Sequence, residues 1–314
     1  MSERDDSEFY EIESWDEQLA FLIRYAILAP SSHNRQPWSF RIANDRIEVY
    51  ADYSRRLPVV DPADRELLMS VGAAITNLRV AAAHFGFETS VLYQSRPEES
   101  VPLAFVSIHE TCAPDPRLAA LFPSIKRRHT NRSSFDAVPL KPEAREALFD
   151  LMTEFPQVLR FVLPCDKQRA VQLVTAGDRN QMARPAFRDE WADCMPSGGV
   201  APWLVRRFDV GRFLARHDAE LIASSSLLLV ITADDDRPSL IRAGEVLERV
   251  LLTITRLGLQ YSFMNQPVAV ETLRGQLWSL IGSTTPPQLL LRVGEARAVR
   301  RAAPRRAVES VLRS

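Results

Sequence analysis

One short segment of the chain gathers polar side chains between two prolines. Pro30 and Pro37 enclose Ser31, Ser32 and Asn34, directly after an apolar stretch. Proline cannot continue a helix, so the amides and side chains of this segment have no regular ladder to join and are free to hold a ligand. Serine and asparagine are also common turn residues, which leaves an ordinary loop as the other interpretation.

Two basic segments could complete an anion-binding site. Arg128, Thr130 and Arg132 are spaced as R-x-[ST]-x-R, and Arg305 and Arg306 lie near the end of the chain. On a helical turn, the two outer arginines of the first segment share one face, where their guanidiniums can bind a phosphate or a polar ring edge. Each pattern also suits a solvated surface, as a charged helix face or a charged tail.

The sequence offers little support for other catalytic or metal chemistry. No Ser-His-Asp arrangement or catalytic carboxylate pair is evident. Cys112, Cys165 and Cys194 are scattered without CxxC or Cys/His spacing, which argues against a zinc site or a disulfide framework. Three aspartates at 234–236 resemble a metal-binding run, but they lie between a predicted strand and a predicted helix, where capping and solvation account for them. We therefore predict no metal site.

The composition favours a folded protein that acts on a small molecule. The 314 residues are 46% hydrophobic, enough for one large domain or two ordinary ones. The 39 basic residues nearly cancel the 40 acidic ones, so the overall charge indicates neither nucleic acid nor an anionic membrane as a partner. The acidic N-terminal sequence lacks the pattern of a signal peptide, and no apolar run reaches the roughly 18 residues of a membrane span. We expect a cytoplasmic protein.

The apolar pattern predicts helices and strands that alternate along the chain. Helices are expected near residues 15–29, 61–86, 142–155, 166–182, 240–257 and 270–281. Strands are expected near residues 38–42, 46–50, 89–93, 103–108, 158–163, 227–232, 261 and 288–293. Residues 1–14 are expected to be disordered or loosely held, and residues 191–203 to be irregular.

The chain contains a candidate internal repeat. The 19 residues that start at Gly72 align without a gap to those that start at Gly244, and similar strands flank both segments. Many helices run between two glycines, so coincidence is one explanation. The shared strand, helix and strand order favours a duplication instead. Two such halves would pack about a pseudo-two-fold axis, as an isologous dimer does.

Three motifs resemble those of the nitroreductase-like FMN flavoproteins. APSSHNRQPWSF resembles the family's APSxxNxQPW signature, RHTNR its R-x-S-x-R flavin motif, and PRRAVESVL its C-terminal basic element. The repeat further resembles the Acg-type branch, in which one chain imitates the family homodimer. The resemblance implies an α+β protein with a three-layer α/β/α fold and two pseudo-symmetric halves that form an intramolecular dimer. We expect intertwined halves at residues 15–125 and 126–314, and a monomer that carries its own dimer-like interface.

The resemblance also implies how FMN would be held. The first half would supply groups near the flavin ring, namely Ser31, Ser32 and Asn34. The second half would supply Arg128, Thr130 and Arg132, with Arg305 and Arg306 on the phosphate, and Asn265 would lie in a loop beside the flavin N5. Each half lacks the other's motif, so we expect one flavin. An insert at about residues 184–208 would fold over it as a lid.

Two functions follow from this resemblance. The first is an FMN-dependent oxidoreductase of nitroreductase type, which passes electrons from NADH or NADPH through flavin N5 to a nitro, quinone or similar acceptor. The alternative is a protein that binds or sequesters FMN beneath its lid with little or no turnover. A relative that has lost the flavin is a third, which the intact motifs disfavour. The flavin carries the chemistry in this family, so no catalytic side chain is required.

Overall fold

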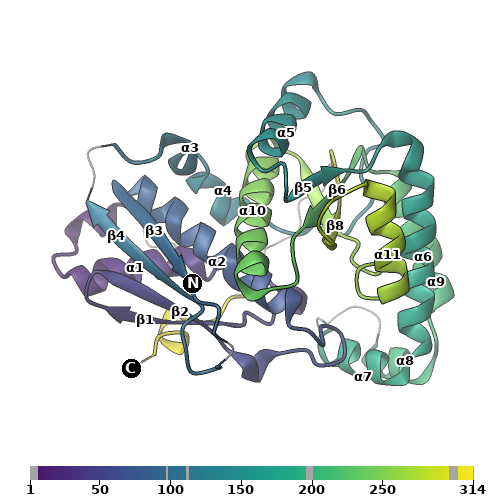
Figure 1. Ribbon diagram of the computed structural model, residues 1–314, viewed down its shortest axis with the longest axis horizontal. Helices are drawn as coiled ribbons and strands as arrows, with labels where there is room; N and C mark the ends of the chain where they lie inside the picture. Colours follow the sequence, from purple (N-terminus) through teal and green to yellow (C-terminus); the bar gives the residue numbers. More distant parts are fainter. Residues whose placement is uncertain (1–5, 97, 111–112, 196–200, 297–302, 314) are drawn as a thin grey trace.

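The computed structural model describes residues 6–96, 98–110, 113–195, 201–296 and 303–313. These residues form two four-stranded antiparallel sheets with the same strand order (Figure 1). The first sheet has the order β1-β2-β4-β3. Its strands are β1 (Trp38–Ala43), β2 (Arg46–Ala51), β3 (Phe87–Tyr93) and β4 (Ala104–Glu110). The second sheet has the order β5-β6-β8-β7. Its strands are β5 (Leu159–Phe161), β6 (Leu227–Thr232), β7 (Gln260–Phe263) and β8 (Pro287–Gly294). The repeated order confirms two similar halves.

Helices flank both sheets and lie between them (Figure 1). The first half has α1 (Trp15–Ala26), α2 (Arg65–His84), α3 (Pro116–Ala119) and α4 (Phe122–Arg127). The second half has α5 (Pro142–Glu154), α6 (Lys167–Ala183), α9 (Gly211–Ala223), α10 (Arg237–Arg256) and α11 (Glu271–Ile281). The predicted helices are all present, and α4 spans the predicted boundary between residues 125 and 126. Helices α3, α4 and α9 were not predicted.

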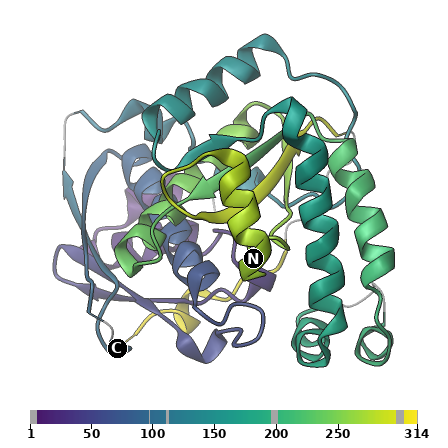
Figure 2. The same ribbon diagram turned by 45° about the vertical axis from the view of Figure 1, so that its right-hand side comes forward.

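The insert predicted at 184–208 contains two short helices. They are α7 (Pro185–Asp193) and α8 (Pro202–Arg207). The prediction that residues 191–203 are irregular was therefore wrong at both ends, because α7 continues to Asp193 and α8 begins at Pro202. Each helix begins with a proline, which fits the first helical turn. Residues 196–200 between them lie outside the described residues. Figure 2 shows α6 and α9 side by side, with α7 and α8 at their lower ends.

The two halves meet where α2 crosses α10. A Cβ added at Gly72 of α2 would lie 1.9 Å from the carbonyl oxygen of Ile241, and one added at Gly244 of α10 would lie 2.1 Å from that of Met69. In the gap-free repeat alignment, Gly72 matches Gly244 and Met69 matches Ile241. The two contacts are therefore the same contact seen from each half, as a pseudo-two-fold axis requires.

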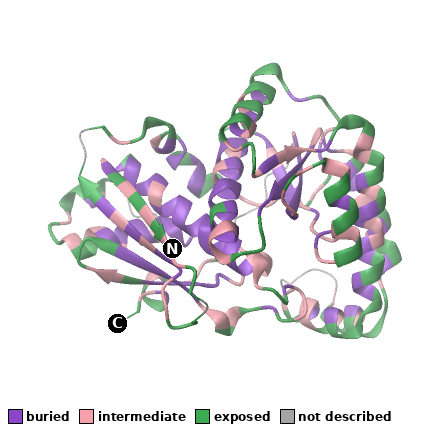
Figure 3. Ribbon diagram, in the orientation of Figure 1, coloured by how far each residue is buried: buried purple, intermediate pink, exposed green. Residues whose placement is uncertain are grey.

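The core is continuous across this crossing. The buried cluster of the first half includes Ile241 and Leu252 of α10, and that of the second half includes Met69 of α2. Figure 3 shows that α2 and α10 are largely buried where they meet. Helix α2 is long and apolar enough to cross a membrane, and it is the only such helix among the described residues. Because 89% of its apolar window is buried inside the fold, its composition is that of a core helix.

Both chain ends pack against the first half. Residues 6–11 form a 3-10 helix whose Phe9 is 3% exposed and stacks on Phe85 with ring centroids 4.2 Å apart. This part of the N-terminal segment is therefore held by apolar burial rather than loose, while residues 1–5 lie outside the described residues. At the other end, the Phe40 N–H of β1 donates to Val311 O (2.8 Å), and the Arg313 N–H donates to Phe40 O (2.7 Å). The tail of the second half thus extends onto the first.

Candidate FMN site

The polar segment after α1 has an unusual backbone. His33, Asn34 and Gln36 have φ angles of 48°, 57° and 52°, in the left-handed region that non-glycine residues seldom adopt. The Gln36 N–H donates to the Ser31 Oγ at 2.9 Å and closes the turn. Pro30 ends the preceding helical segment, so the chain reverses here before β1 begins at Trp38. Such strain often marks a binding site.

The three segments singled out from the sequence meet at one backbone atom. The carbonyl oxygen of Leu28 accepts hydrogen bonds from the Nη2 atoms of Arg128 (2.7 Å) and Arg305 (3.1 Å). The Asn34 side chain donates to Pro304 O (3.0 Å) and accepts from the Nη1 of Arg305 (3.2 Å). The fold therefore brings residues from both halves of the chain into one cluster.

Arg128 lies at the buried end of this cluster. Its side chain is 2% exposed, and its Nε lies 3.2 Å from the carboxylate of Glu248 on α10, which is fully buried. Its Nη1 donates to the Tyr261 hydroxyl at 2.6 Å, and the Thr130 side chain hydrogen-bonds the same hydroxyl. Burial raises the pKa of Glu248, and the positive charges of Arg128 and Arg305 oppose this rise.

This cluster fits an anionic group such as the FMN phosphate. Arg128 and Arg305 face a single carboxylate, Glu248, among the described residues, so the cluster carries an excess positive charge. The Nε of Arg305 is buried and has no hydrogen-bond partner in the described part of the chain. Burial, followed by the charge of Arg128, lowers the pKa of Arg305 to about 10. An anion would neutralise the excess charge and give the free N–H an acceptor.

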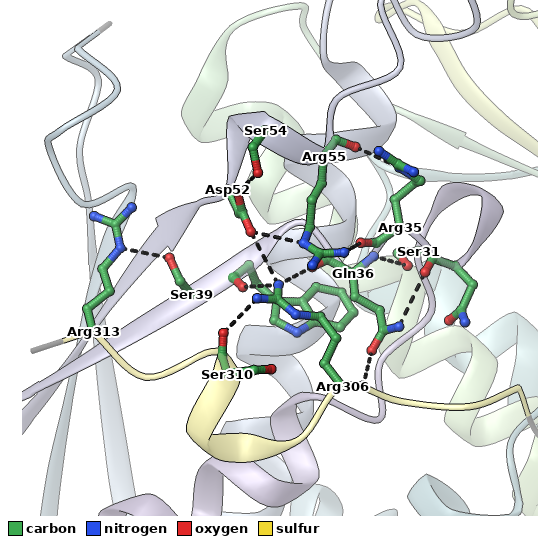
Figure 4. A network of polar contacts seen from close by, with 12 residues as sticks. Ser31, Arg35, Gln36, Ser39, Asp52, Ser54, Arg55, Arg306, Ser310 and Arg313 are labelled. Atoms are coloured by element: carbon green, nitrogen blue, oxygen red, sulfur yellow. Dashed lines mark hydrogen bonds and ion pairs between the residues drawn. The ribbon is translucent and has the colours of Figure 1, made fainter. Parts of the chain in front are cut away.

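Arg306 has a different set of contacts (Figure 4). Its guanidinium donates to Gln36 O (3.1 Å), Asp52 Oδ2 (3.3 Å) and Ser310 O (2.7 Å), and its backbone N–H donates to the Gln36 Oε1 (2.8 Å). These contacts tie the C-terminal tail to the first half. Of the two neighbouring arginines, Arg305 therefore has the donor left for a ligand.

The other predicted residues lie around a second group of charges. Asn265, in the loop after β7, donates to Glu66 Oε1 of α2 (2.9 Å) and accepts from the Leu290 N–H (3.1 Å). Glu66 and the exposed Arg132 both act on the pKa of His33, which burial lowers, so these three side chains share one neighbourhood. Ser32 lines a small cavity close by, next to Asp61 and Ser70.

The insert docks beside this second group. The Glu190 carboxylate of α7 accepts from the Val59 N–H (3.0 Å) and the Val60 N–H (2.6 Å) in the loop before α2. Its charge also acts on His33. The insert is therefore fixed to the first half at the edge of the candidate site.

Sequence reasoning missed four residues of this arrangement. Glu248 lies on the otherwise apolar face of α10, and an acid at a core position of an amphipathic helix was a signal that could have been read. Tyr261, Glu66 and Glu190 gave no comparable signal, because their partners are distant in sequence.

Comparison with known proteins finds relatives that match almost the whole chain. No family model matches it. A Mycobacterium tuberculosis protein named "Putative NAD(P)H nitroreductase Rv3131" is 28% identical over 300 residues, which cover 89% of this chain and 86% of the relative. Another from that organism, "Putative NAD(P)H nitroreductase acg", is 27% identical over 313 residues, covering 92% and 93%.

A solved structure shares the fold over almost the whole chain. It is the crystal structure of a putative nitroreductase from Anabaena variabilis, with a TM-score of 0.52 and 11% identity, and the match covers 93% of this chain and 91% of that one. The full-length relatives, the shared fold and the duplicated halves agree with one another. The chain is therefore similar over nearly its whole length to nitroreductase-like proteins of the Acg-type branch, and these findings support that family.

Proposed function

We propose that this protein is an FMN-dependent oxidoreductase that passes electrons from NAD(P)H to a nitro, quinone or similar electron-poor acceptor. The observation that carries the proposal is the buried cluster of Arg128, Glu248 and Arg305, whose excess positive charge and free N–H match a phosphate. The cluster adjoins the strained turn at 31–36, as a site shared by two halves would require. The relatives' names, which include NAD(P)H nitroreductase, support the class of reaction.

In this proposal each half of the chain has its own task. Arg305, Arg128 and Thr130 would hold the phosphate, and Arg306 would hold the C-terminal tail in place. Ser31, Ser32 and Asn34 would line the flavin ring. When bound, FMN would supply a hydride acceptor at N5 and pass the electrons on.

Two residues would act at the edge of the ring. Arg132 is exposed and carries the positive charge that would favour an anionic reduced cofactor. The Asn265 side chain is engaged with Glu66 and Leu290, so it would fix a loop whose backbone N–H groups would face the ring. Because both halves contribute to a single site, we propose one FMN per chain and a functional monomer.

The contact of the insert supports a second candidate function. Glu190 binds two backbone N–H groups of the first half, which would keep the insert closed beside the site. A closed insert would exclude nicotinamides and bulky acceptors. The protein would then bind or sequester FMN with little turnover.

An absorbance spectrum of the freshly purified protein, followed by anaerobic titration with NADH and NADPH, separates these functions. Bleaching of bound flavin by either nucleotide and its recolouring by a nitroaromatic or a quinone support the oxidoreductase. Flavin that binds but resists both nucleotides supports sequestration. Failure to bind added FMN contradicts both functions.

A pair of arginine variants tests the phosphate cluster itself. Arg305→Gln removes a buried, charged donor, so we expect FMN affinity to fall by about 10-fold to 100-fold, the value of a charge-assisted hydrogen bond. Arg212→Gln, on the exposed face of α9, is the matched control and should bind FMN like the wild type. Equal affinities for the two variants would contradict the assignment of the phosphate.

A further inference from the structure

Two carboxyl groups converge on one amide behind the Asn265 loop. Gln266, the next residue, donates through its Nε2 to Asp178 Oδ1 of α6 (3.1 Å) and to Asp218 Oδ2 of α9 (2.5 Å). Asp178 is 3% exposed. A Cβ at Gly177 would lie 2.6 Å from the Gln266 Cβ, so the loop packs directly against α6 at a position that only glycine allows. None of these four residues has a part in the function proposed above.

The cluster contains more acceptors than donors. Asp178 Oδ2 and Gln266 Oε1 are both buried, and neither has a hydrogen-bond partner in the described residues. An ionised carboxylate and an amide oxygen can only accept, so the two atoms cannot satisfy each other. A proton on Asp178 supplies the missing donor. The acid and the amide can then form a cyclic pair, in which Nε2 donates to Oδ1 and the carboxyl O–H donates to Oε1.

The surrounding charges favour a proton on Asp178 in particular. Burial raises the pKa of Asp178 to about 8, the negative charge of Asp218 adds to this rise, and the Gln266 hydrogen bond opposes it. Burial also raises the pKa of Asp218, but His217 and Arg292 oppose that rise, together with Gln266. Two carboxyls that share a buried site cannot both be ionised cheaply, and Asp218 has the guanidinium of Arg292 to favour its charge.

We propose that Asp178 and Asp218 hold one proton between them at neutral pH, and that this protonated pair positions Gln266 and the adjoining Asn265 loop. Loss of the proton at alkaline pH leaves two carboxylates facing one amide and frees the loop. Asn265 also bonds Glu66 of the first half, so the position of the loop is linked to the opposite wall of the candidate site. The consequence for flavin binding rests on the function proposed above.

The first test concerns the proton alone and needs no flavin. Infrared difference spectra between the wild type and Asp178→Asn, both without added FMN, should contain a carbonyl band of a protonated carboxyl group at about pH 7, and this band should vanish above about pH 9. Glu248 and Asp61, whose pKa values burial raises to about 7, are present in both proteins, so their bands cancel in the difference. Asp150→Asn, an exposed aspartate on α5, is the matched control and should keep the band when it replaces the wild type in the difference. Absence of the band from the wild-type difference at neutral pH overturns the inference.

The second test concerns the position of the loop. The dissociation constant of FMN, measured by flavin fluorescence between about pH 7 and pH 9, should rise in the wild type by up to about tenfold per pH unit. Asp178→Asn should show a smaller rise, because its amide keeps a donor for the Gln266 Oε1 at every pH. The rise that remains in this variant comes from the phosphate cluster, where burial raises the pKa of Glu248 to about 7 and lowers that of Arg305 to about 10. Asp150→Asn should follow the wild type.

A second variant keeps the inference testable if Asp178→Asn folds poorly. Asp218→Asn removes the neighbouring negative charge, so the rise in the dissociation constant should move to lower pH. An unmoved rise, or a constant that does not depend on pH while the infrared band titrates, overturns the positioning role. Failure to bind FMN at any pH overturns the proposed function instead, and the infrared test then decides the shared proton by itself.

Discussion

Replacing Gly72 by alanine tests whether the crossing of α2 and α10 sets the relative position of the two halves. The new Cβ would lie 1.9 Å from the Ile241 carbonyl oxygen, whereas ordinary contacts begin at 3.4 Å. The helices must then separate by about 1.5 Å, the difference between these distances, because a backbone oxygen cannot rotate away. Overpacking of a close-packed core costs about 1–3 kcal/mol. We expect a loss at the upper end of this range, about 3 kcal/mol in the free energy of unfolding.

The chain supplies two matched variants for this experiment. Gly244→Ala should cost as much as Gly72→Ala, because its Cβ would meet the Met69 carbonyl oxygen at 2.1 Å. Gly275 lies on the exposed face of α11, where an added Cβ has no neighbour within 4 Å. Gly275→Ala should therefore stabilise the protein by about 0.5–1 kcal/mol, the usual gain for alanine inside a helix.

Urea unfolding of the wild type and the three variants measures these changes. FMN affinity should fall in the two crossing variants as well, because Gly244 lies one turn before Glu248 on α10. A loss below about 1 kcal/mol in Gly72→Ala, the average for any substitution, would refute the steric reasoning. A destabilising Gly275→Ala would show that helix propensity is not the deciding factor on the exposed face.

Three further outcomes are expected. Glu190→Gln replaces a carboxylate that accepts from two backbone N–H groups, so the insert should open more readily and NAD(P)H should bleach the flavin faster. Asp189→Asn, an exposed position on the same helix, should leave the rate of bleaching unchanged. Slower bleaching in Glu190→Gln would contradict the role of this contact. Phe9→Ala should cost about 3–5 kcal/mol in urea unfolding, as for other buried aromatic rings, whereas Tyr10→Ala, at 73% exposed, should cost far less. The pKa of the Asp178 carboxyl is about 8 in the folded protein and 3.8 in the unfolded chain. Its contribution to the free energy of unfolding is therefore complete below about pH 4 and is lost as the pH rises through about 8. Asp178→Asn should flatten this part of the pH dependence of unfolding, and an unchanged slope would contradict the raised pKa.

The elements predicted from sequence are those with strong local patterns. The hairpin of β1 and β2 alternates around Asn44 and Asp45, and Asn44 has the positive φ of 57° that such a tight turn requires. Helices α2 and α10 carry long apolar stripes, and their match predicted two halves about a pseudo-two-fold axis; the crossing at Gly72 and Gly244 was found only in the structure. Helix α9 was missed because charged residues interrupt its few buried positions. The local sequence therefore predicted the helices and strands that bury one continuous apolar face.

The candidate site was predictable only in part. Motifs indicated Arg128 and Arg305, but the residue that neutralises them, Glu248, lies 120 positions beyond Arg128 and has no local mark of its partner. The Nε–H of Arg305 has no acceptor among the residues that the structure describes, whereas the guanidinium of Arg306 already donates to protein atoms such as Ser310 O. This difference depends on the path of the C-terminal tail over the first half. Two adjacent arginines with the same local sequence thus differ through long-range contacts alone.

The asymmetry of the repeat gives a physical reason to expect one site rather than two. In the gap-free alignment, Glu248 corresponds to Thr76 and Tyr261 to Thr89. Thr76 donates to the Glu245 carbonyl oxygen, so in the first half this position joins the helices rather than balancing a buried cation. The carboxylate of the same Glu245 pairs with Arg79 (2.8 Å), so that guanidinium is already neutralised and is not left over for an anion. The duplicated scaffold is therefore symmetric where α2 and α10 cross, but it has the charges to hold an anion on one side only, and titration should reach saturation at one FMN per chain.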